Sequence, residues 1–150
     1  MNDPDQSDLE DGLRRRFDVE LLVVHPTIDP LEISAALGLD ASNMHRVGER
    51  RITVRGTPLE GTYRDSRWRH SIRHEVKDQF FADKVQDLVN RLVPHKKFLH
   101  HLRATGGRTS LIVQFLGDGY FGDKIPSDTL AKLADLQLDC GIECFMTPQV

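Results

Sequence analysis

The stretch FDVELLVV, residues 17–24, and the stretch IDPLEIS, residues 28–34, together decide the fold class. The first alternates between apolar and polar residues and then runs apolar, which predicts a buried strand. In the second, Asp29 can cap a helix whose first position is the following proline, and a glutamate three residues after the cap completes a capping box. The helix should end near Gly38, because glycine readily takes the left-handed conformation that closes helices.

Hydrophobic periodicity predicts the remaining elements on both sides of this unit. Further strands are expected at residues 51–55, 67–74, 111–116 and 142–146. Further helices are expected at residues 78–93, with Asp78 as the cap, at residues 95–104 and from Ser127 onward. The glycine-containing segment 56–61 is predicted to be a turn or loop.

Residues 17–55 and 108–147 share one plan: a strand, a loop, a short helix marked by proline, and a second strand. This is an internal repeat of pattern and not of residue identity. Two such units pack as a mostly antiparallel sheet with helices on one face. The predicted fold class is therefore α+β, with ferredoxin-like, pseudo-duplicated strand-helix-strand units.

The composition fits one soluble domain of 150 residues, since 39% of them are hydrophobic and 29% are charged. A stretch of apolar residues long enough for a membrane span is not found, and the first twelve residues lack the order of a signal peptide. Two cysteines do not make a disulfide-rich scaffold. We therefore expect a cytoplasmic protein that has no membrane partner and no cofactor.

The net charge of −3 hides an uneven distribution along the chain. The first twelve residues hold five acids and no base, which predicts a disordered acidic tail over residues 1–15, followed by a single α+β domain over residues 16–150. Residues 44–77 hold nine Lys or Arg against four acids, so they sum to +5. A local anion-binding surface is therefore compatible with the mildly acidic whole.

Arginines alternate along two of the predicted strands and could form one positive sheet face: Arg51, Arg55, Arg67, Arg69 and Arg73. Such a face would bind phosphates or an acidic protein surface. The other interpretation is a solvated face whose charge prevents edge-to-edge aggregation. Trp68 alternates to the opposite face, so the arginines lack the stacking platform that single-stranded nucleic acid requires.

Three further patterns predict no chemistry. The segment GDGYFG, residues 117–122, matches a dinucleotide fingerprint, but the next helix start is at Ser127, too late to meet a pyrophosphate. Cys140 and Cys144 fall on one strand about 13 Å apart, which excludes a disulfide or a shared metal between them. The histidine spacings also fit no metal site, and the sequence contains no recognisable catalytic triad or dyad.

Several segments, in this order, resemble a family of bacterial proteins called domain of unknown function 4279. They are IDPLEIS at 28–34, LGL at 37–39, HRVGE at 45–49, SRW at 66–68, LVNRLVP at 88–94, and the leucine-rich helix 130–138 with the strand 142–145. The last strand departs from the family, which tends to place an Asp and a Tyr there. The resemblance implies a small bacterial α+β domain and no established activity. It draws attention to His45, Arg46, Gly48 and Trp68, which match the family pattern.

These observations favour a non-enzymatic binding or protein-interaction module, of which an immunity protein is one version. Its partner would be an unidentified protein or an anionic ligand, and a homodimer formed through a free sheet edge is possible. One alternative is a small-molecule or phosphoryl-handling enzyme with a cleft near His45 and Trp68, where Arg46, Arg64 and His70 should also converge. The other is a nucleic-acid or anion binder that uses the arginine face.

Overall fold

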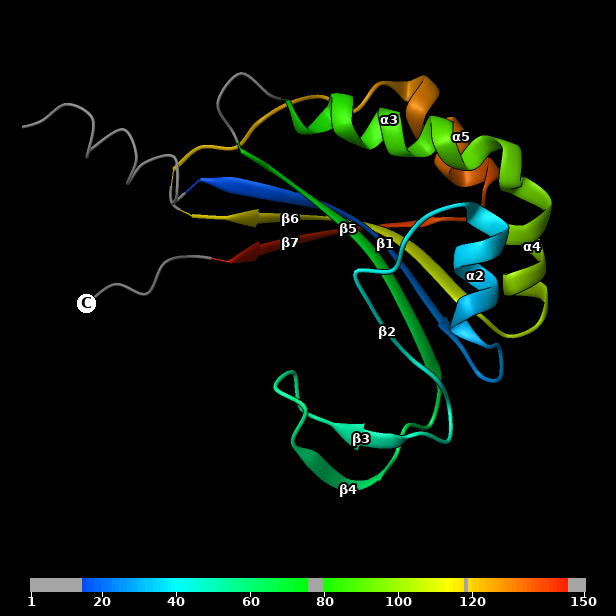
Figure 1. Cartoon of the computed structure of the whole chain (residues 1–150). Helices are drawn as coiled ribbons and strands as arrows, with labels where there is room; N and C mark the ends of the chain where they lie inside the picture. The colour runs from blue at the N-terminus through cyan, green and yellow to red at the C-terminus, as the bar shows by residue number, and fades with distance from the viewer. Residues whose placement is uncertain (1–14, 76–79, 118, 146–150) are drawn as a thin grey trace, which may run out of the picture.

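The computed structural model describes residues 15–75, 80–117 and 119–145. Figure 1 shows one sheet with helices on one of its faces and a separate hairpin that projects beyond the sheet. The strands of the sheet, in spatial order, are β2 (Asn43–His45), β5 (Ser66–Glu75), β1 (Arg16–His25), β6 (Arg108–Leu116) and β7 (Asp139–Phe145). The helices are α2 (Pro30–Leu37), α3 (Phe81–Leu92), α4 (Lys96–Ala104) and α5 (Ser127–Asp135), with a 3₁₀ turn at Val93–His95.

The sheet is mixed and mostly antiparallel. β1 runs antiparallel to both of its neighbours, β5 and β6, and β2 runs antiparallel to β5. β7 runs parallel to β6. The predicted α+β class and the predicted single helical layer are confirmed.

The two segments that the sequence suggests as a repeat are not equivalent in the sheet. β5 lies between β1 and β2, whereas β6 and β7 are direct neighbours. Helix α2 therefore connects strands that are separated by a third, and α5 connects adjacent ones. The second strand predicted for the first segment, at residues 51–55, is also not part of this sheet, since the strand that follows α2 here is β2. Strand pairing depends on long-range contacts that the pattern of elements does not contain.

The projecting hairpin corrects the prediction for residues 51–61. Strand β3 (Arg50–Ile52) ends before Arg55, and part of the predicted loop is strand β4 (Pro58–Thr62). A tight turn joins them, in which the Thr53 amide donates to the Thr57 carbonyl at 2.8 Å. Gly56 has φ of 83°, a conformation that few residues other than glycine adopt easily. The chain therefore reverses where alternation alone suggests that a strand continues.

The expected start and end of the first helix are confirmed. The Asp29 carboxylate accepts a hydrogen bond from the Leu31 amide at 3.0 Å, and Gly38 closes the helix with φ of 64°. α5 begins at Ser127, as predicted. The residue before α3 is Phe80, and the predicted cap Asp78 lies outside the described residues, as does the acidic segment 1–14.

The hydrophobic core lies between the helices and the sheet. Alternate residues of β1 are buried on this side, among them Phe17, Val19 and Leu21. Trp68 of β5 is fully buried, and its indole N–H donates to the Ser34 hydroxyl of α2 at 2.8 Å. Because side chains alternate across a strand, the residues between these face the uncovered side of the sheet.

Candidate functional site

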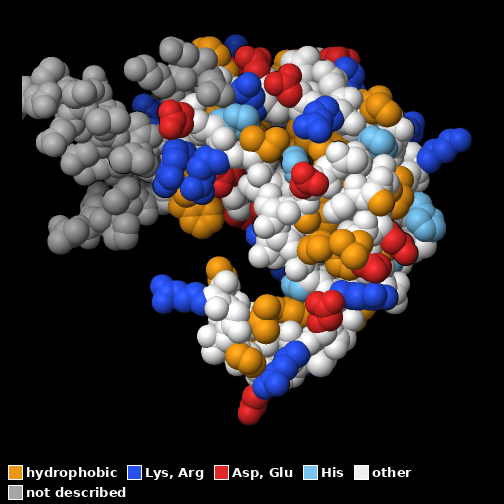
Figure 2. Space-filling view, in the orientation of Figure 1, with side chains coloured by type: hydrophobic (Ala, Val, Ile, Leu, Met, Phe, Trp, Pro, Cys, Tyr) orange, Lys and Arg blue, Asp and Glu red, His pale blue; other side chains and the backbone are white. Residues whose placement is uncertain are grey.

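The uncovered face of the sheet carries a polar pocket of about 420 Å³. We call this surface, on the side of the sheet away from the helices, the open face. The pocket is formed by residues of β1, β2, β5 and β6 and of the segment before β2: Asp18, Glu20, Ser42, Asn43, His45, Arg67, Arg69, Ser71 and Gln114. The hairpin of β3 and β4 stands apart from this face, and Figure 2 shows the hollow between them.

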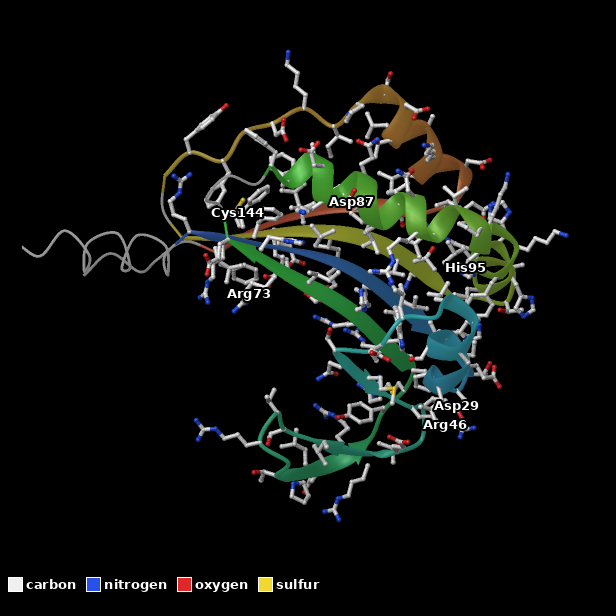
Figure 3. The ribbon with its side chains drawn as sticks, turned by 45° about the horizontal axis from the view of Figure 1, so that its top comes forward. Asp29, Arg46, Arg73, Asp87, His95 and Cys144 are labelled. Carbon is white, nitrogen blue, oxygen red and sulfur yellow. The ribbon has the colours of Figure 1, made fainter. Side chains whose placement is uncertain are left out.

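Asp18 lies deep in this face and is fully paired. Its carboxylate accepts two hydrogen bonds from the Arg73 guanidinium, at 2.9 and 3.1 Å. β1 and β5 hold the two side chains together because Asp18 and Arg73 are directly opposite in the strand register. The same contact raises the pKa of Arg73. Figure 3 shows Arg73 on the side of the sheet away from the helices.

Glu20, two residues along β1 on the same face, is buried but incompletely paired. It is only 4% exposed, and its Oε1 lies 3.7 Å from Nη1 of Arg69, beyond hydrogen-bond distance. Its other oxygen, Oε2, has no hydrogen-bond partner among the described residues. Burial raises the pKa of Glu20; Glu143 and Asp18 add to this, and Arg69 opposes it.

His45 forms the rim of the pocket on the β2 side. Its ring stacks on Tyr63 with the ring centroids 3.6 Å apart and the planes 6° from parallel. Its Nε2 lies 3.8 Å from Oδ1 of Asp65, and Nε of Arg67 lies 3.6 Å from the same oxygen. Burial and the nearby Arg67 lower the pKa of His45, which favours the neutral imidazole.

The structure divides the five predicted arginines between two surfaces. Arg67, Arg69 and Arg73 share the open face, as the alternation predicts, whereas Arg51 and Arg55 belong to the hairpin. The prediction of one five-arginine face is therefore wrong. In addition, each arginine of the open face lies within 4 Å of a carboxylate, from Asp65, Glu20 and Asp18 respectively. The charge of this face is balanced and not strongly positive.

The predicted convergence of four side chains near His45 is also wrong. His45 lines the pocket, but Arg46 turns away to pair with Asp29 at 3.3 Å, and Figure 3 shows these two together beside α2. The Nδ1 of His70 lies 2.7 Å from the Asp40 carbonyl, and Arg64 lies in the turn before β5. Trp68, with no exposed surface, is part of the core.

Sequence reasoning missed Asp18 and Glu20, the acidic part of this site. They looked like the polar half of an alternating strand, which is typical of solvent-facing residues. Alternation alone carried no signal that these two acids are buried, because it does not say which side chains of neighbouring strands cover them. Only the strand order shows that β1 is central and that both acids meet the arginines of β5.

Within the described ranges, we find no group of three His, Cys, Asp or Glu side chains able to hold a metal ion. Cys140 and Cys144 are both exposed on β7, as expected for a strand. Over the same ranges, none of the helices is both long enough and apolar enough to span a membrane.

A family model described as a domain of unknown function, DUF4279, matches residues 15–144. The chain belongs to this family. The matched DUF4279 segment contains the whole pocket and the projecting hairpin, so both are features of the domain itself. No curated protein matches the chain, and no solved structure does.

Proposed function

We propose that this DUF4279 domain is a non-enzymatic binding module that takes a polar group of a protein partner into the pocket of the open face. The observation that carries the proposal is the state of Glu20, whose buried carboxylate lines the pocket with one oxygen unpartnered. A buried, incompletely paired carboxylate lowers stability, and such residues are concentrated at functional sites. An N–H or O–H donor from a partner would satisfy this oxygen.

The rim of the pocket supports a partner group of mixed charge. The side chains of Arg67 and Arg69 are 41% and 38% exposed, and the guanidinium groups of both lie beyond hydrogen-bond distance from their carboxylates. Each has N–H groups with which to bind a carboxylate of the partner. A segment that offers a donor to Glu20 and a carboxylate to the arginines would satisfy both sides of the pocket.

The hairpin favours a protein over a small molecule as the partner. Three of its apolar side chains are exposed: Ile52 is 52% exposed, Leu59 is 37% exposed and Val54 is fully exposed. Protein interfaces commonly combine apolar contacts with arginine, whereas a small ligand is usually enclosed in an apolar cavity. The hairpin would supply apolar contact area, and the pocket would supply the specific polar contacts.

The test is photo-crosslinking in cells of the source organism. A benzoylphenylalanine is placed at Arg67, on the pocket rim, or at Lys132 of α5 as the matched control, since both side chains are similarly exposed. We expect one discrete protein adduct from position 67 that is absent from position 132 and lost when Glu20→Gln is added. Equal adducts at both positions, or none at position 67, would overturn the proposal. So would a small molecule that copurifies with the wild type and not with Glu20→Gln.

One observation favours a second candidate, an enzyme that transfers protons. Glu20 with its raised pKa and His45 with its lowered pKa line the same pocket, and groups perturbed in this way can serve as an acid and a base. Hydrolysis of a set of phosphate esters tests this candidate. Activity that falls at least about tenfold in both Glu20→Gln and His45→Gln, and not in Lys132→Ala, would support it.

We also propose that the fold is ferredoxin-like with one addition. The order β2, β5, β1, β6 and the alternating directions of these strands support this, with α5 and β7 added at one edge. An experimental structure with a different strand order would contradict it.

A further inference from the structure

Strand β7 forms one edge of the sheet and exposes an unusual set of side chains. It pairs with β6 on one side and is the last strand in the sheet order. Ile142 is 68% exposed and Phe145 is 52% exposed, and the residues Cys140 and Cys144 are also exposed. The strand is seven residues long, whereas β2 at the opposite edge has three. A long edge strand with exposed apolar residues is a ready template for pairing with another strand.

The sequence of β7 matches itself in one antiparallel register. When Ile142 faces the Ile142 of a second copy, Cys140 faces Cys144 and Gly141 faces Glu143. The apolar pair lies at the centre, and the acids are not directly opposite each other. Directly opposed side chains in an antiparallel pair interact most strongly, so this register combines apolar contact with little charge repulsion.

The neighbouring antiparallel registers of β7 are less favourable because they place like charges opposite each other. Directly opposed side chains of two paired strands lie on the same face of the sheet. Each alternative register of two β7 strands therefore has one residue at its centre that faces its own copy in the second chain. A centre at Glu143 places the two copies of this acid opposite each other. A centre at Gly141 places Glu143 opposite Asp139, again with like charges. A register centred farther from the middle of β7 leaves only a short stretch of paired residues.

We propose that β7 is a self-association surface through which two copies of this chain pair antiparallel, centred on Ile142, into one continuous sheet. A twofold axis perpendicular to the sheet keeps both open faces on the same side and both helical layers on the other. The two pockets then lie on one shared surface. The proposal does not depend on what the pocket binds, because none of the residues lining the pocket belongs to β7.

The two cysteines provide a test of the register. Opposed residues of an antiparallel pair have Cβ atoms about 5 Å apart, which allows a short crosslinker or a disulfide to join them. In the proposed dimer, Cys140 of one copy faces Cys144 of the other. Neither cysteine faces its own symmetry mate, so a chain with one cysteine cannot crosslink to an identical chain.

The experiment mixes two single-cysteine variants, Cys140→Ser and Cys144→Ser, that carry tags of different mass, and treats them with a short bis-maleimide. We expect crosslinked heterodimers from the mixture and no crosslinked dimer from either variant alone. Crosslinked dimers from one variant alone would overturn the register. A wild-type chain that remains monomeric in sedimentation at high concentration would overturn the dimer itself.

A substitution at the centre of β7 distinguishes pairing through this edge strand from non-specific association of exposed apolar residues. Ile142→Asp places two carboxylates opposite each other, so the dimer dissociation constant should rise about tenfold or more. Val54→Asp changes an apolar residue on the hairpin that is even more exposed, and it should leave dimerisation unchanged. Thermal unfolding of both variants verifies that they are folded. Equal weakening by both substitutions would contradict the proposal.

Discussion

The two faces of the same sheet differ in the polarity of their buried side chains and in how completely these are hydrogen-bonded. On the helix side, Leu21 and Trp68 are fully buried, and the one polar group of Trp68 is hydrogen-bonded to Ser34. On the open face, Asp18 and Glu20 are almost as buried, but they are charged, and Glu20 is incompletely paired. The difference indicates that the helix side contributes most of the stability, whereas the open face holds a buried carboxylate oxygen with no hydrogen-bond partner among the described residues. Substitutions on the two faces should therefore change the free energy of unfolding by different amounts, and even in opposite directions.

Trp68→Ala should have the largest effect. Removal of a fully buried indole leaves a cavity among the core side chains, so the free energy of unfolding should fall by about 3–5 kcal/mol in urea denaturation. Its neighbour on the open face is the control: Arg69→Ala should change the free energy by less than about 1 kcal/mol. Similar losses in both variants would mean that the two faces do not differ as described.

Asp18→Asn, on the open face, should have the next largest effect on the free energy of unfolding. The substitution keeps the size of the side chain but removes the charge that accepts two hydrogen bonds from Arg73. The free energy of unfolding should fall by about 1–2 kcal/mol, because Arg73 is half exposed and water replaces part of the contact. Gln114→Ala, which removes an exposed contact to Glu143, should change it by less than about 0.5 kcal/mol. A smaller loss for Asp18→Asn than for this control would contradict the pairing.

Glu20→Gln should have the opposite sign. Because the folded pKa of Glu20 is raised above its usual value of 4.5, this residue stabilises the fold below that pH, and the contribution is lost as the pH rises through the folded pKa. At pH 7 the variant should therefore be more stable than the wild type, by about 1 kcal/mol. Denaturation between pH 4.5 and 7.5 measures this gap, which should widen as the pH rises. A variant that is less stable than the wild type at pH 7 would show that the pair with Arg69 dominates.

His25, on the helix side of the sheet, should have the smallest effect, which is a change in how stability depends on pH. This residue is 4% exposed; its Nδ1 accepts from the Thr27 and Ile28 amides, and its Nε2 lies 2.8 Å from the Thr105 hydroxyl. This arrangement needs a neutral ring, and burial and the nearby His101 lower its pKa below the usual 6.5.

The contribution of His25 is thus present above about pH 6.5 and lost as the pH falls through the folded pKa. Stability of the wild type should decrease between pH 7 and pH 5 more steeply than stability of His25→Gln. Above pH 7 the two profiles should run parallel, which serves as the internal control. Equal slopes below pH 6.5 would show that His25 does not contribute.

Much of the fold was predictable because its signals are local. The cap at Asp29, the glycine at position 38 and the start of α5 at Ser127 each depend on a few neighbouring residues. The alternation along β5 also placed Trp68 and the arginines on opposite faces correctly. The hairpin was mistaken for a strand and a loop, since a turn competes with a continuing strand through backbone hydrogen bonds that alternation does not record.

The candidate site was predictable only on its basic side. The arginines of β5 stood out in the sequence as a run of charge, and His45 was singled out by the family pattern. Arg51 and Arg55, which share that run, lie on the hairpin, so the charge count overstated how positive the open face is. Two of the three acids that balance it, Asp18 and Glu20, come from β1, far away in the sequence.

The sequence by itself determined the positions of the helices and of the long strands β1, β5 and β6, and which side of each of these strands is apolar, since periodicity and capping act over a few residues. Only the tertiary structure decided that β1 lies between β5 and β6, because that order comes from packing the whole hydrophobic core. Central placement buries Asp18 and Glu20 beside arginines from another strand. The same packing leaves β7 at the edge with its apolar residues exposed, where the proposed partner is a second copy.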